Sequence, residues 1–585
     1  MSTRLPERTD TVAPVAPGST AGRPLRRGAG GSARFVRWAV LVVLAYFFLI
    51  PIARLLWLSF ASKGGYGLDN YRVVLQQAET WESVYNTMYV SVLSTVMAVV
   101  LGVYFAWLTA YTDIRFKRLL QPFIVLPFIL PPYIVTLAWA QAFGTEGLAD
   151  RLLGLLPGDV HVNLYSLGGI AFVLGITHFP IVYLLTVTVM QRIPREIEQA
   201  ARASGAGRWT TMRRVTLVSA LPGIAGGALL SFLTALDNFG VPAFLGIPAN
   251  IDVLSTQIYQ EIVGFGPSAF YRAAALSVLL GVIAVLGTIG QWALLRRSHQ
   301  SETVQVDSTP RVALGPWRLP VQVLTWAFLL FILVVPVASM VRTSLSKAIG
   351  VKVTLSTASL AQYRYLFERS DDMQSAMTNS VRLGLLAMLV CLVAGTYIAY
   401  VRTRRPSWLS KLVDTSVALP YALPGIVMGL GLIFAWVQPL PGVYPGIYGT
   451  WVILLVAYVT RFTFYQVRSS AAAFSQLDPS IEEAARASGA GTWTTWRRVL
   501  LPLLTTGLLG GAGLVLLTSL SELTVSSILY SASSKTIGVV IFGFEQAGYS
   551  NLSTAASTVV LLIYAVVGVA GYTLQRLLRR RIGTR

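Results

Sequence analysis

Long apolar stretches are the feature that most restricts what this chain can fold into. A helix needs roughly 20 consecutive apolar residues to cross the hydrocarbon core of a bilayer. The 585 residues are 54% hydrophobic and 12% charged, whereas a soluble domain carries about 25% charged residues. We therefore predict an all-α polytopic membrane protein with about 12 transmembrane helices. The spans lie near 35–58, 86–110, 119–143, 164–190, 219–246, 273–295, 319–341, 379–401, 412–437, 447–467, 502–530 and 555–575.

Four of these spans carry a signal for bending. The stretches 219–246 and 502–530 are longer than one straight span requires, so we expect a tilt or a break in each. The third span of each half contains prolines, which lack the backbone N–H that continues a helix. We expect these two spans to be kinked. The prolines concerned are Pro127, Pro131, Pro420 and Pro424.

The distribution of basic residues predicts the orientation of the spans. The net charge is +21, but Lys and Arg lie in short segments between apolar runs, which argues against a nucleic-acid partner. Basic connections are retained preferentially on the cytoplasmic side of a membrane. With both termini in the cytoplasm, the cytoplasmic segments hold 33 of the 46 Lys and Arg residues and the outer connections hold nine. We therefore expect both termini to be cytoplasmic.

The remaining composition bounds the chemistry. Residues 1–34 are rich in Pro, Gly, Ser, Thr and Arg, which predicts a disordered cytoplasmic tail. The apolar run that follows is too long for a signal peptide, so we expect it to be retained. A single cysteine, Cys391, excludes a disulfide framework. With three histidines in the whole chain, no metal site is predicted.

The two halves of the sequence repeat each other. Residues 198–215 read EQAARASGAGRWTTMRRV and residues 482–499 read EEAARASGAGTWTTWRRV, so 15 of 18 positions agree. Each half holds six spans, an even number, so both halves enter the membrane in the same sense and form a parallel repeat. A duplication retained only for stability would not make a connecting loop the best-matched part. The predicted units are the tail 1–34, a first repeat 35–297, a cytoplasmic linker 298–318, a second repeat 319–578 and a basic tail 579–585.

Both matched loops follow the fourth span of their half and predict a helix–turn–helix. Acidic residues stand near the positive end of the first helix, alanines favour the helix, and glycines end it. A short helix with small side chains and charged flanks suits a partner's groove, although an interfacial helix on lipid headgroups has similar features. The residues are Glu198, Ala200, Ala201, Gly205 and Gly207 in the first copy and Glu482, Glu483, Ala484, Ala485, Gly489 and Gly491 in the second.

The loop pattern, E-[EQ]-A-A-x-x-x-G followed by a basic stretch and LP, resembles the coupling motif of type I ABC importer permeases. The first copy departs from it, with LVSALP at 217–222 in place of LLP. The resemblance implies a bacterial inner-membrane permease with its substrate pathway between the two halves. It also implies that Glu198 and Glu482 contact a cytoplasmic ATPase, present in two copies, and that an extracytoplasmic binding protein delivers the substrate.

This chain has no G-x-x-x-x-G-K-[ST] motif, so it lacks a P-loop for ATP. We therefore expect a transporter subunit that is not an enzyme and binds no cofactor, with ATP and Mg²⁺ on the partner ATPase. A gradient-driven secondary transporter with 12 helices is the alternative, and the repeated loop argues against it. For an integral membrane enzyme we find no paired catalytic carboxylates, Ser–His arrangement or metal set.

Two permeases fused in one chain resemble the iron(III) group, which also includes thiamine and aminoalkylphosphonate permeases. DNFGVPAFLG (237–246), VLSTQIY (253–259) and SLSELTVSSILY (519–530) resemble the ferric members. We therefore expect ferric iron as the substrate, with thiamine or an aminoalkylphosphonate as alternatives.

Polar residues within the spans are candidates for the pathway, because ionisable groups are costly in a bilayer. Asp237, Asn238 and Glu522 lie in the long fifth-type spans, where Asn238 aligns with Glu522. Two carboxylates on a pathway would favour a cationic substrate, whereas carboxylates that cap a helix break would be structural. Arg461 is expected to pair with a carboxylate or extend to the headgroups, and His178 to line the pathway or simply pack.

Overall fold

The computed structural model describes residues 29–62, 65–144, 147–154, 162–264, 269–295, 307, 309–348, 351, 353–354, 356–437 and 446–583. These residues form helices throughout, apart from connecting turns and one hairpin of β1 (Ala61–Ser62) and β2 (Gly65–Tyr66). The predicted tail lies largely outside the described residues. Helix α1 (Ala29–Ser59) begins at Ala29.

Nine helical segments within the described residues are long and apolar enough to cross a membrane, and two further pairs of helices pass the same test as bent spans. They account for eleven of the twelve predicted spans. The twelfth is α19 (Trp451–Ser475), whose 25 residues include Arg461 and Arg468. The nine segments contain α1, α3 (Ala78–Tyr111), α7 (Leu167–Met190), α10 (Leu217–Asp237), α13 (Ala269–Leu295), α14 (Arg318–Ser344), α16 (Asp371–Arg404), α22 (Leu501–Leu520) and α25 (Ser550–Gly583).

The third span of each half is broken, as its prolines predict. The axes of α4 (Lys117–Ile129) and α5 (Pro132–Phe143) meet at 98°, and those of α17 (Trp408–Ala422) and α18 (Gly425–Trp436) meet at 115°. Pro131 and Pro424 stand in the two breaks, where a missing N–H is tolerated. Pro127 and Pro420 lie inside the preceding helices.

The long fifth-type spans are broken as well. Helix α10 ends at Asp237 and α11 (Gly240–Leu245) follows, while α22 ends at Leu520 and α23 (Ser526–Leu529) follows. The other connecting helices are α2 (Asp69–Gln76), α6 (Leu148–Leu153), α12 (Leu254–Gly264), α15 (Ala361–Glu368) and α24 (Ile537–Gln546), with short 3₁₀ turns at Ile247–Ala249 and Gly315–Trp317.

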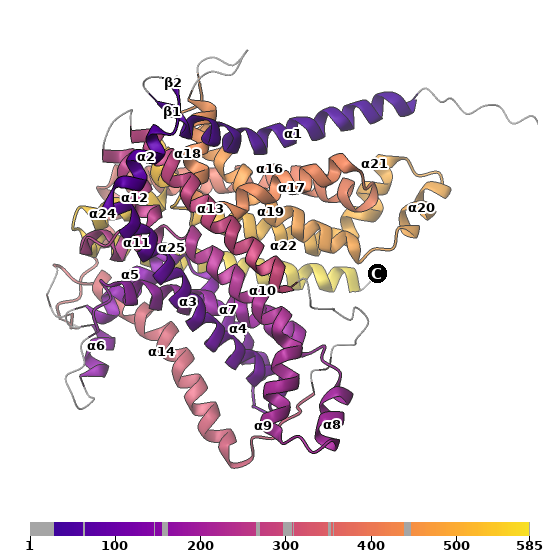
Figure 1. The fold of residues 1–585 in the computed structure, drawn as a ribbon, viewed down its shortest axis with the longest axis horizontal. Helices are drawn as coiled ribbons and strands as arrows, with labels where there is room; N and C mark the ends of the chain where they lie inside the picture. The colour runs from indigo at the N-terminus through magenta and orange to yellow at the C-terminus, as the bar shows by residue number, and fades with distance from the viewer. Residues whose placement is uncertain are drawn as a thin grey trace, which may run out of the picture.

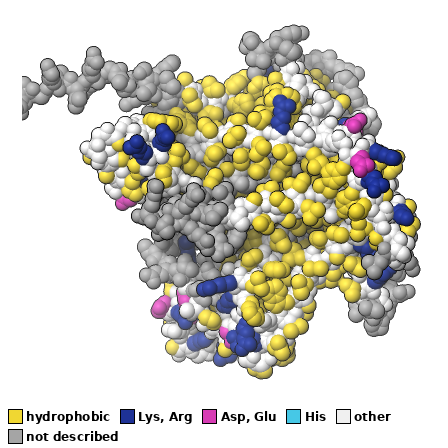
Figure 2. All heavy atoms as spheres, turned by 180° about the vertical axis from the view of Figure 1, so that it is seen from behind, with side chains coloured by type: hydrophobic (Ala, Val, Ile, Leu, Met, Phe, Trp, Pro, Cys, Tyr) yellow, Lys and Arg dark blue, Asp and Glu magenta, His cyan; other side chains and the backbone are white. Residues whose placement is uncertain are grey.

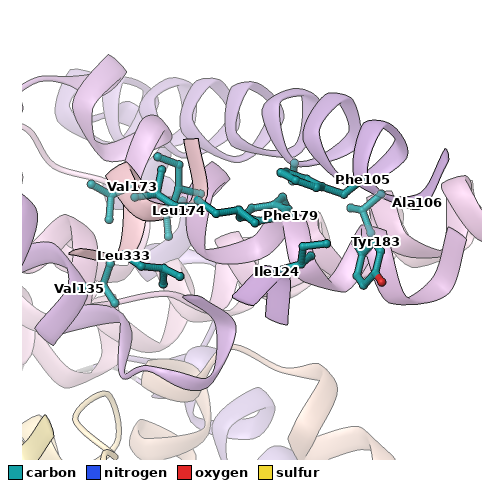
Figure 3. Close-up of a cluster of buried hydrophobic side chains, with 14 of the residues drawn as sticks. Phe105, Ala106, Ile124, Val135, Val173, Leu174, Phe179, Tyr183 and Leu333 are labelled. Atoms are coloured by element: carbon teal, nitrogen blue, oxygen red, sulfur yellow. The ribbon is translucent and has the colours of Figure 1, made fainter. Parts of the chain in front are cut away.

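Each half is built around three helices that pack on one another: α3, α7 and α10 in the first half, and α16, α19 and α22 in the second. Matched glycines allow this approach. A Cβ on Gly102 would lie 2.6 Å from Cβ of Val182, and one on Gly395 would lie 2.8 Å from Cβ of Gln466. Figure 3 shows the first of these cores, where Phe105 of α3 faces Phe179 of α7.

The two halves exchange their first helices. Helix α1 of the first half packs against α17 and α18 of the second, and α14 of the second half packs against α5 of the first (Figure 1). The sequence repeats 35–297 and 319–578 are therefore interlocked and do not form two separate bodies.

Polar and basic groups gather at the ends of the molecule. Figure 2 shows a broad belt of hydrophobic side chains over the middle, with Lys and Arg towards the ends. Many large apolar side chains are exposed, Val43, Val96 and Leu286 among them, which suits contact with lipid. The first residues of α1 and the C-terminus lie at one end, and β1, β2, α2 and α24 lie at the other (Figure 1).

Candidate functional site

The two matched loops form nearly the same elbow, which confirms the predicted helix–turn–helix. In the first half α8 (Arg195–Ala203) is followed by α9 (Arg208–Thr211) and a π-helical turn (Met212–Thr216) that continues into α10. In the second half α20 (Ser480–Ala487), α21 (Thr492–Thr495) and a π-helical turn (Trp496–Leu500) lead into α22. We call residues 195–216 the first elbow and residues 480–500 the second elbow.

The glycines end the first helix of each elbow. Gly205 and Gly489 have φ angles of +85° and +80°, in the left-handed region that favours glycine. Their backbone N–H groups donate to the carbonyls of Arg202 and Arg486, each at 3.0 Å. This closes the helix and turns the chain back. The same geometry in both copies follows directly from the repeated ASGAG sequence.

The first elbow is held by a buried carboxylate. Glu198 is 5% exposed. Its Oε1 accepts hydrogen bonds from the hydroxyls of Tyr111 (2.9 Å) and Thr216 (2.6 Å). Its Oε2 forms an ion pair with Nη1 of Arg311 at 3.2 Å. The carboxylate therefore ties α8 to the end of α3, to the π-helical turn and to the segment that precedes α14.

The second elbow is held in a closely related way. Glu482 is 4% exposed. Its Oε1 accepts from Nε of Arg404 at 2.8 Å, and its Oε2 accepts from the hydroxyl of Tyr400 at 3.3 Å. Arg486, one turn further along α20, forms a longer ion pair of 3.7 Å with the same carboxylate.

Contact of Glu198 and Glu482 with an ATPase stays a prediction of the family resemblance. In this structure both carboxylates are enclosed by groups of this chain. A buried ion pair satisfies the charge internally, so neither carboxylate is presented to a partner in this structure. The outward side of each elbow is formed by the other predicted residues. Ala200, Gly205, Gly207, Glu483, Ala484, Gly489 and Gly491 are exposed, and Ala201 and Ala485 are half-buried.

Sequence reasoning missed the most exposed large side chains of the elbows. Trp209 and Trp493 are 75% and 73% exposed and occupy the same position of the repeat. Tryptophan is a frequent anchor of protein interfaces. The signal was present, because each tryptophan begins the matched stretch WTT, two residues after Gly207 or Gly491.

The two elbows differ in how their inner sides are packed. The ring of Trp496 packs against Tyr400 with 4.9 Å between ring centroids. The first copy has Met212 at the position of Trp496, and a pocket of about 490 Å³ lies there, lined by Trp107 and Trp209 among others. The smaller Met212 side chain leaves the inner side of the first elbow open.

A second cluster joins the two halves inside the bundle. Asp237, at the end of α10, forms an ion pair with Nη2 of Arg461 in α19. Its Oδ1 also accepts a hydrogen bond from the backbone N–H of Gly425 at 2.5 Å, at the start of α18. The side chains of Arg461 and Asp237 are 11% and 29% exposed. Of the two arrangements considered for Arg461, pairing with a carboxylate is the one found.

Gly425 makes this contact sterically possible. A Cβ at this position would lie within 3 Å of the guanidinium of Arg461. The helix break at Pro424 therefore brings three elements together: the end of α10, the start of α18 and the middle of α19. We call Asp237, Gly425 and Arg461 the inter-half contact.

The other polar candidates have local roles in this structure. The side-chain Oδ1 of Asn238 accepts from the N–H of Val241 at 2.9 Å. Glu522 accepts from the N–H groups of Val525 and Ser526 at 2.8 and 2.9 Å. Both side chains thus cap the short helix after a break, which is the structural alternative for the aligned pair. His178 is buried inside α7.

Comparison with known proteins shows the family. The profile of the family described as "Binding-protein-dependent transport system inner membrane component" matches residues 98–299 and again residues 391–584. These two matches correspond to the two halves and together cover more than half of the chain. The family thus recurs once in each repeat.

Several curated relatives align with this chain. The "Probable ABC transporter permease protein y4fN" of Sinorhizobium fredii is 26% identical, over 87% of this chain and 90% of its own length. The "Ferric transport system permease protein FbpB" of Actinobacillus pleuropneumoniae is 24% identical, over 91% and 77%. The "Molybdenum transport system permease protein ModB" of Escherichia coli is 29% identical, over 36% and 92%.

Among solved structures, a bacterial ABC transporter involved in the import of alginate aligns with a TM-score of 0.39 and 18% identity, over 46% of this chain and 98% of its own. The double family match and the full-length relatives carry the assignment, together with the apolar spans and the repeated elbows. The chain belongs to the binding-protein-dependent transport system inner membrane components, as a fused two-repeat permease subunit of an ABC importer.

Proposed function

We propose that this permease forms the whole transmembrane pathway of an importer for ferric iron in the bacterial inner membrane. Each elbow receives one copy of a cytoplasmic ATPase, which binds ATP and Mg²⁺. An extracytoplasmic binding protein delivers the substrate at the opposite end, and both termini lie on the cytoplasmic side.

The observation that carries the docking proposal is the pair of matched elbows at one end of the molecule. Figure 1 places α8 and α20 apart from one another at the end that also holds the C-terminus. Their outward faces present the same small residues and the same exposed tryptophan. Two nearly identical surfaces suit two copies of one partner, since small side chains permit close approach and tryptophan supplies apolar contact area.

The inter-half contact supports a pathway between the halves. Alternating access in transporters built from repeats requires one half to move against the other. Asp237 belongs to the first half and Gly425 and Arg461 to the second. We infer that this contact holds the halves together in the conformation described and separates when the pathway opens.

Ferric iron is supported by full-length similarity. The relative named as a ferric transport permease aligns over 91% of this chain, so both halves of this chain are matched. A second ferric transport permease, from Haemophilus influenzae, aligns over 85%. The alternative cargo is an oxyanion, because a relative named for molybdenum transport matches one half of the chain and Arg461 supplies a buried cation at the inter-half contact.

Uptake by the reconstituted complex tests the proposal. Proteoliposomes would contain this permease, its ATPase and the binding protein, with radioactive iron(III) or radioactive molybdate outside and ATP inside. We expect ATP-dependent uptake of iron and none of molybdate. Uptake of molybdate alone would overturn the choice of cargo. Uptake that proceeds without the ATPase would overturn the importer mechanism itself.

A further inference from the structure

The arginines that hold the two elbows come from different parts of the chain. In the second half Arg404 is the last residue of α16, and it contacts the carboxylate of Glu482 and the carbonyl of Leu477 (2.7 Å). The matched upstream residues, such as Asn86 and Asn379, are 293 positions apart. At this spacing the counterpart of Arg404 is Tyr111, which has no positive charge.

Arg311, which lies in the linker between the repeats, replaces it. Its Nη1 pairs with Glu198 at 3.2 Å and its Nη2 donates to the carbonyl of Ile193 at 2.6 Å. Ile193 and Leu477 are equivalent, because the elbows are 284 positions apart. Arg311 therefore makes the same two contacts as Arg404. Its guanidinium lies 4.8 Å from the ring centroid of Tyr111, the residue whose missing charge it supplies.

The segment around Arg311 is attached to the first half along its length. The N–H of Asp307 donates to the carbonyl of Gln191 at 2.8 Å. The N–H groups of Arg311 and Val312 donate to the carbonyl of Tyr111 at 2.8 and 2.9 Å. The N–H of Leu314 donates to Asp113 at 3.0 Å.

Charged side chains reinforce both ends of this attachment. Asp307 pairs with Arg195, the first residue of α8, at 2.5 Å. Hydrogen bonds from Arg195 and from Thr309 hold the pKa of Asp307 well below its ordinary value. At the other end, Arg318 donates to the carbonyl of Asp113 at 2.6 Å.

We propose that residues 307 and 309–318, which we call the linker clip, connect the first ATPase-binding elbow directly to the second half, with Arg311 as its positioning residue. Arg318 is both the end of the clip and the first residue of α14. Helix α14 in turn packs against α5 of the first half and α25 of the second half. A displacement of α8 is therefore passed to α14 without crossing the inter-half contact.

The second elbow has no counterpart of this route among the described residues, because Arg404 belongs to α16 of its own half. The outward faces of the two elbows are thus alike, but the first elbow is connected to α14 and the second to α16 of its own half. This inference rests on the proposed docking of an ATPase at α8.

The first experiment replaces the positioning residue in the reconstituted full complex. Arg311 and Glu198 side chains are 5% and 6% exposed, and a buried carboxylate without its partner is strongly destabilised. We expect R311A to lower iron transported per ATP hydrolysed by roughly tenfold, while the ATPase still co-purifies. R364A is the matched control, because Arg364 forms an exposed ion pair, and it should behave as wild type.

Rescue distinguishes this role from a general loss of folding. Y111R places an arginine where the second half has Arg404, so the R311A/Y111R variant should regain most of the lost coupling. R311K should regain part of it, since lysine keeps the charge and loses the second hydrogen bond. The role of Arg311 would be overturned if R311A transported as much iron per ATP as wild type. It would also be overturned if R404A showed the same defect as R311A and the R311A/Y111R variant showed no recovery.

An insertion tests the connection to α14 separately. About ten Gly and Ser residues inserted after Gly315 should leave Arg311 in position. They should make the connection between Arg311 and α14 flexible, because such a linker is a random coil. We expect transport per ATP to fall, whereas the same insertion between residues 300 and 301 should have no effect. Equal coupling in both insertion variants would overturn the clip. Failure of the docking proposal would look different, because A200E would then leave ATPase binding unchanged.

Discussion

The inter-half contact allows a quantitative prediction. D237N replaces the carboxylate by a neutral amide of the same shape and leaves Arg461 buried without its counter-charge. Removing one partner of a fully buried ion pair costs about 3–5 kcal/mol. Asp237 is 29% exposed and Arg461 11%, so water screens part of the loss and we take about 2 kcal/mol. The conformation that contains the contact then loses about 2 kcal/mol, or roughly a factor of 30 in its population ratio to an open one.

The assay is ATP hydrolysis by the reconstituted complex with and without the binding protein. If the contact holds the resting conformation, D237N should raise hydrolysis in the absence of the binding protein several-fold and reduce uptake per ATP. The double variant D237N/R461M removes both charges and should lie closer to wild type than D237N alone, because no uncompensated charge remains.

The matched control is E261Q. Glu261 pairs with Arg272 at 3.0 Å, between α12 and α13 within the first half. Its loss should leave hydrolysis without the binding protein unchanged. Wild-type hydrolysis and uptake in D237N would refute the reasoning, and so would a double variant worse than either single one.

Three further predictions concern the elbows. W209S and W493S together should weaken ATPase co-purification at least tenfold without changing the thermal stability of the permease, because both rings are exposed. A matched pair, W57S and W81S, exposed outside the elbows and the linker clip, should not weaken it, and equal retention of the ATPase in both pairs would contradict the docking surface. E482Q should lower the melting temperature of the permease, because loss of the Glu482 charge leaves Arg404 without a counter-charge in an ion pair worth about 3 kcal/mol. E483Q, on the exposed face, should not lower it. Equal melting temperatures for the two variants would argue against the Glu482–Arg404 ion pair as an anchor of the second elbow. In a C391A background, cysteines at Ser204 and Ser488, both exposed, should react with an impermeant maleimide only in inside-out vesicles, and labelling from the outer side of intact cells would reverse the assigned orientation.

The sequence was sufficient for features that arise locally. Hydropathy identifies a span because a helix of about 20 apolar residues is stable in a bilayer regardless of which helices pack against it. The elbows follow from Ala-rich helices ended by Gly205 and Gly489, whose positive φ angles are a property of the residue itself. The breaks at Pro131 and Pro424 have the same local origin. The repeat then set the number of halves and their common direction.

Features that depend on distant residues were not accessible in this way. For the aligned pair Asn238 and Glu522 the sequence left two alternatives, a place on the pathway and a cap at a helix break. In the structure both side chains cap the next helix. Whether Asp237 faces a pathway or pairs with a charged group depends on the residues that the fold places beside it. Its partner Arg461 stands 224 positions away.

The sequence by itself determined the spans, the duplication and the two elbows, because these rest on periodicity, composition and backbone preference within one segment. Only the tertiary structure decided that α1 and α14 exchange halves, that Glu198 and Glu482 face inwards, and that Arg311 of the linker takes the place of Arg404. Those outcomes depend on which charged groups a packed bundle brings together. A buried carboxylate takes its counter-charge from whichever segment passes close enough, however far along the chain that segment lies.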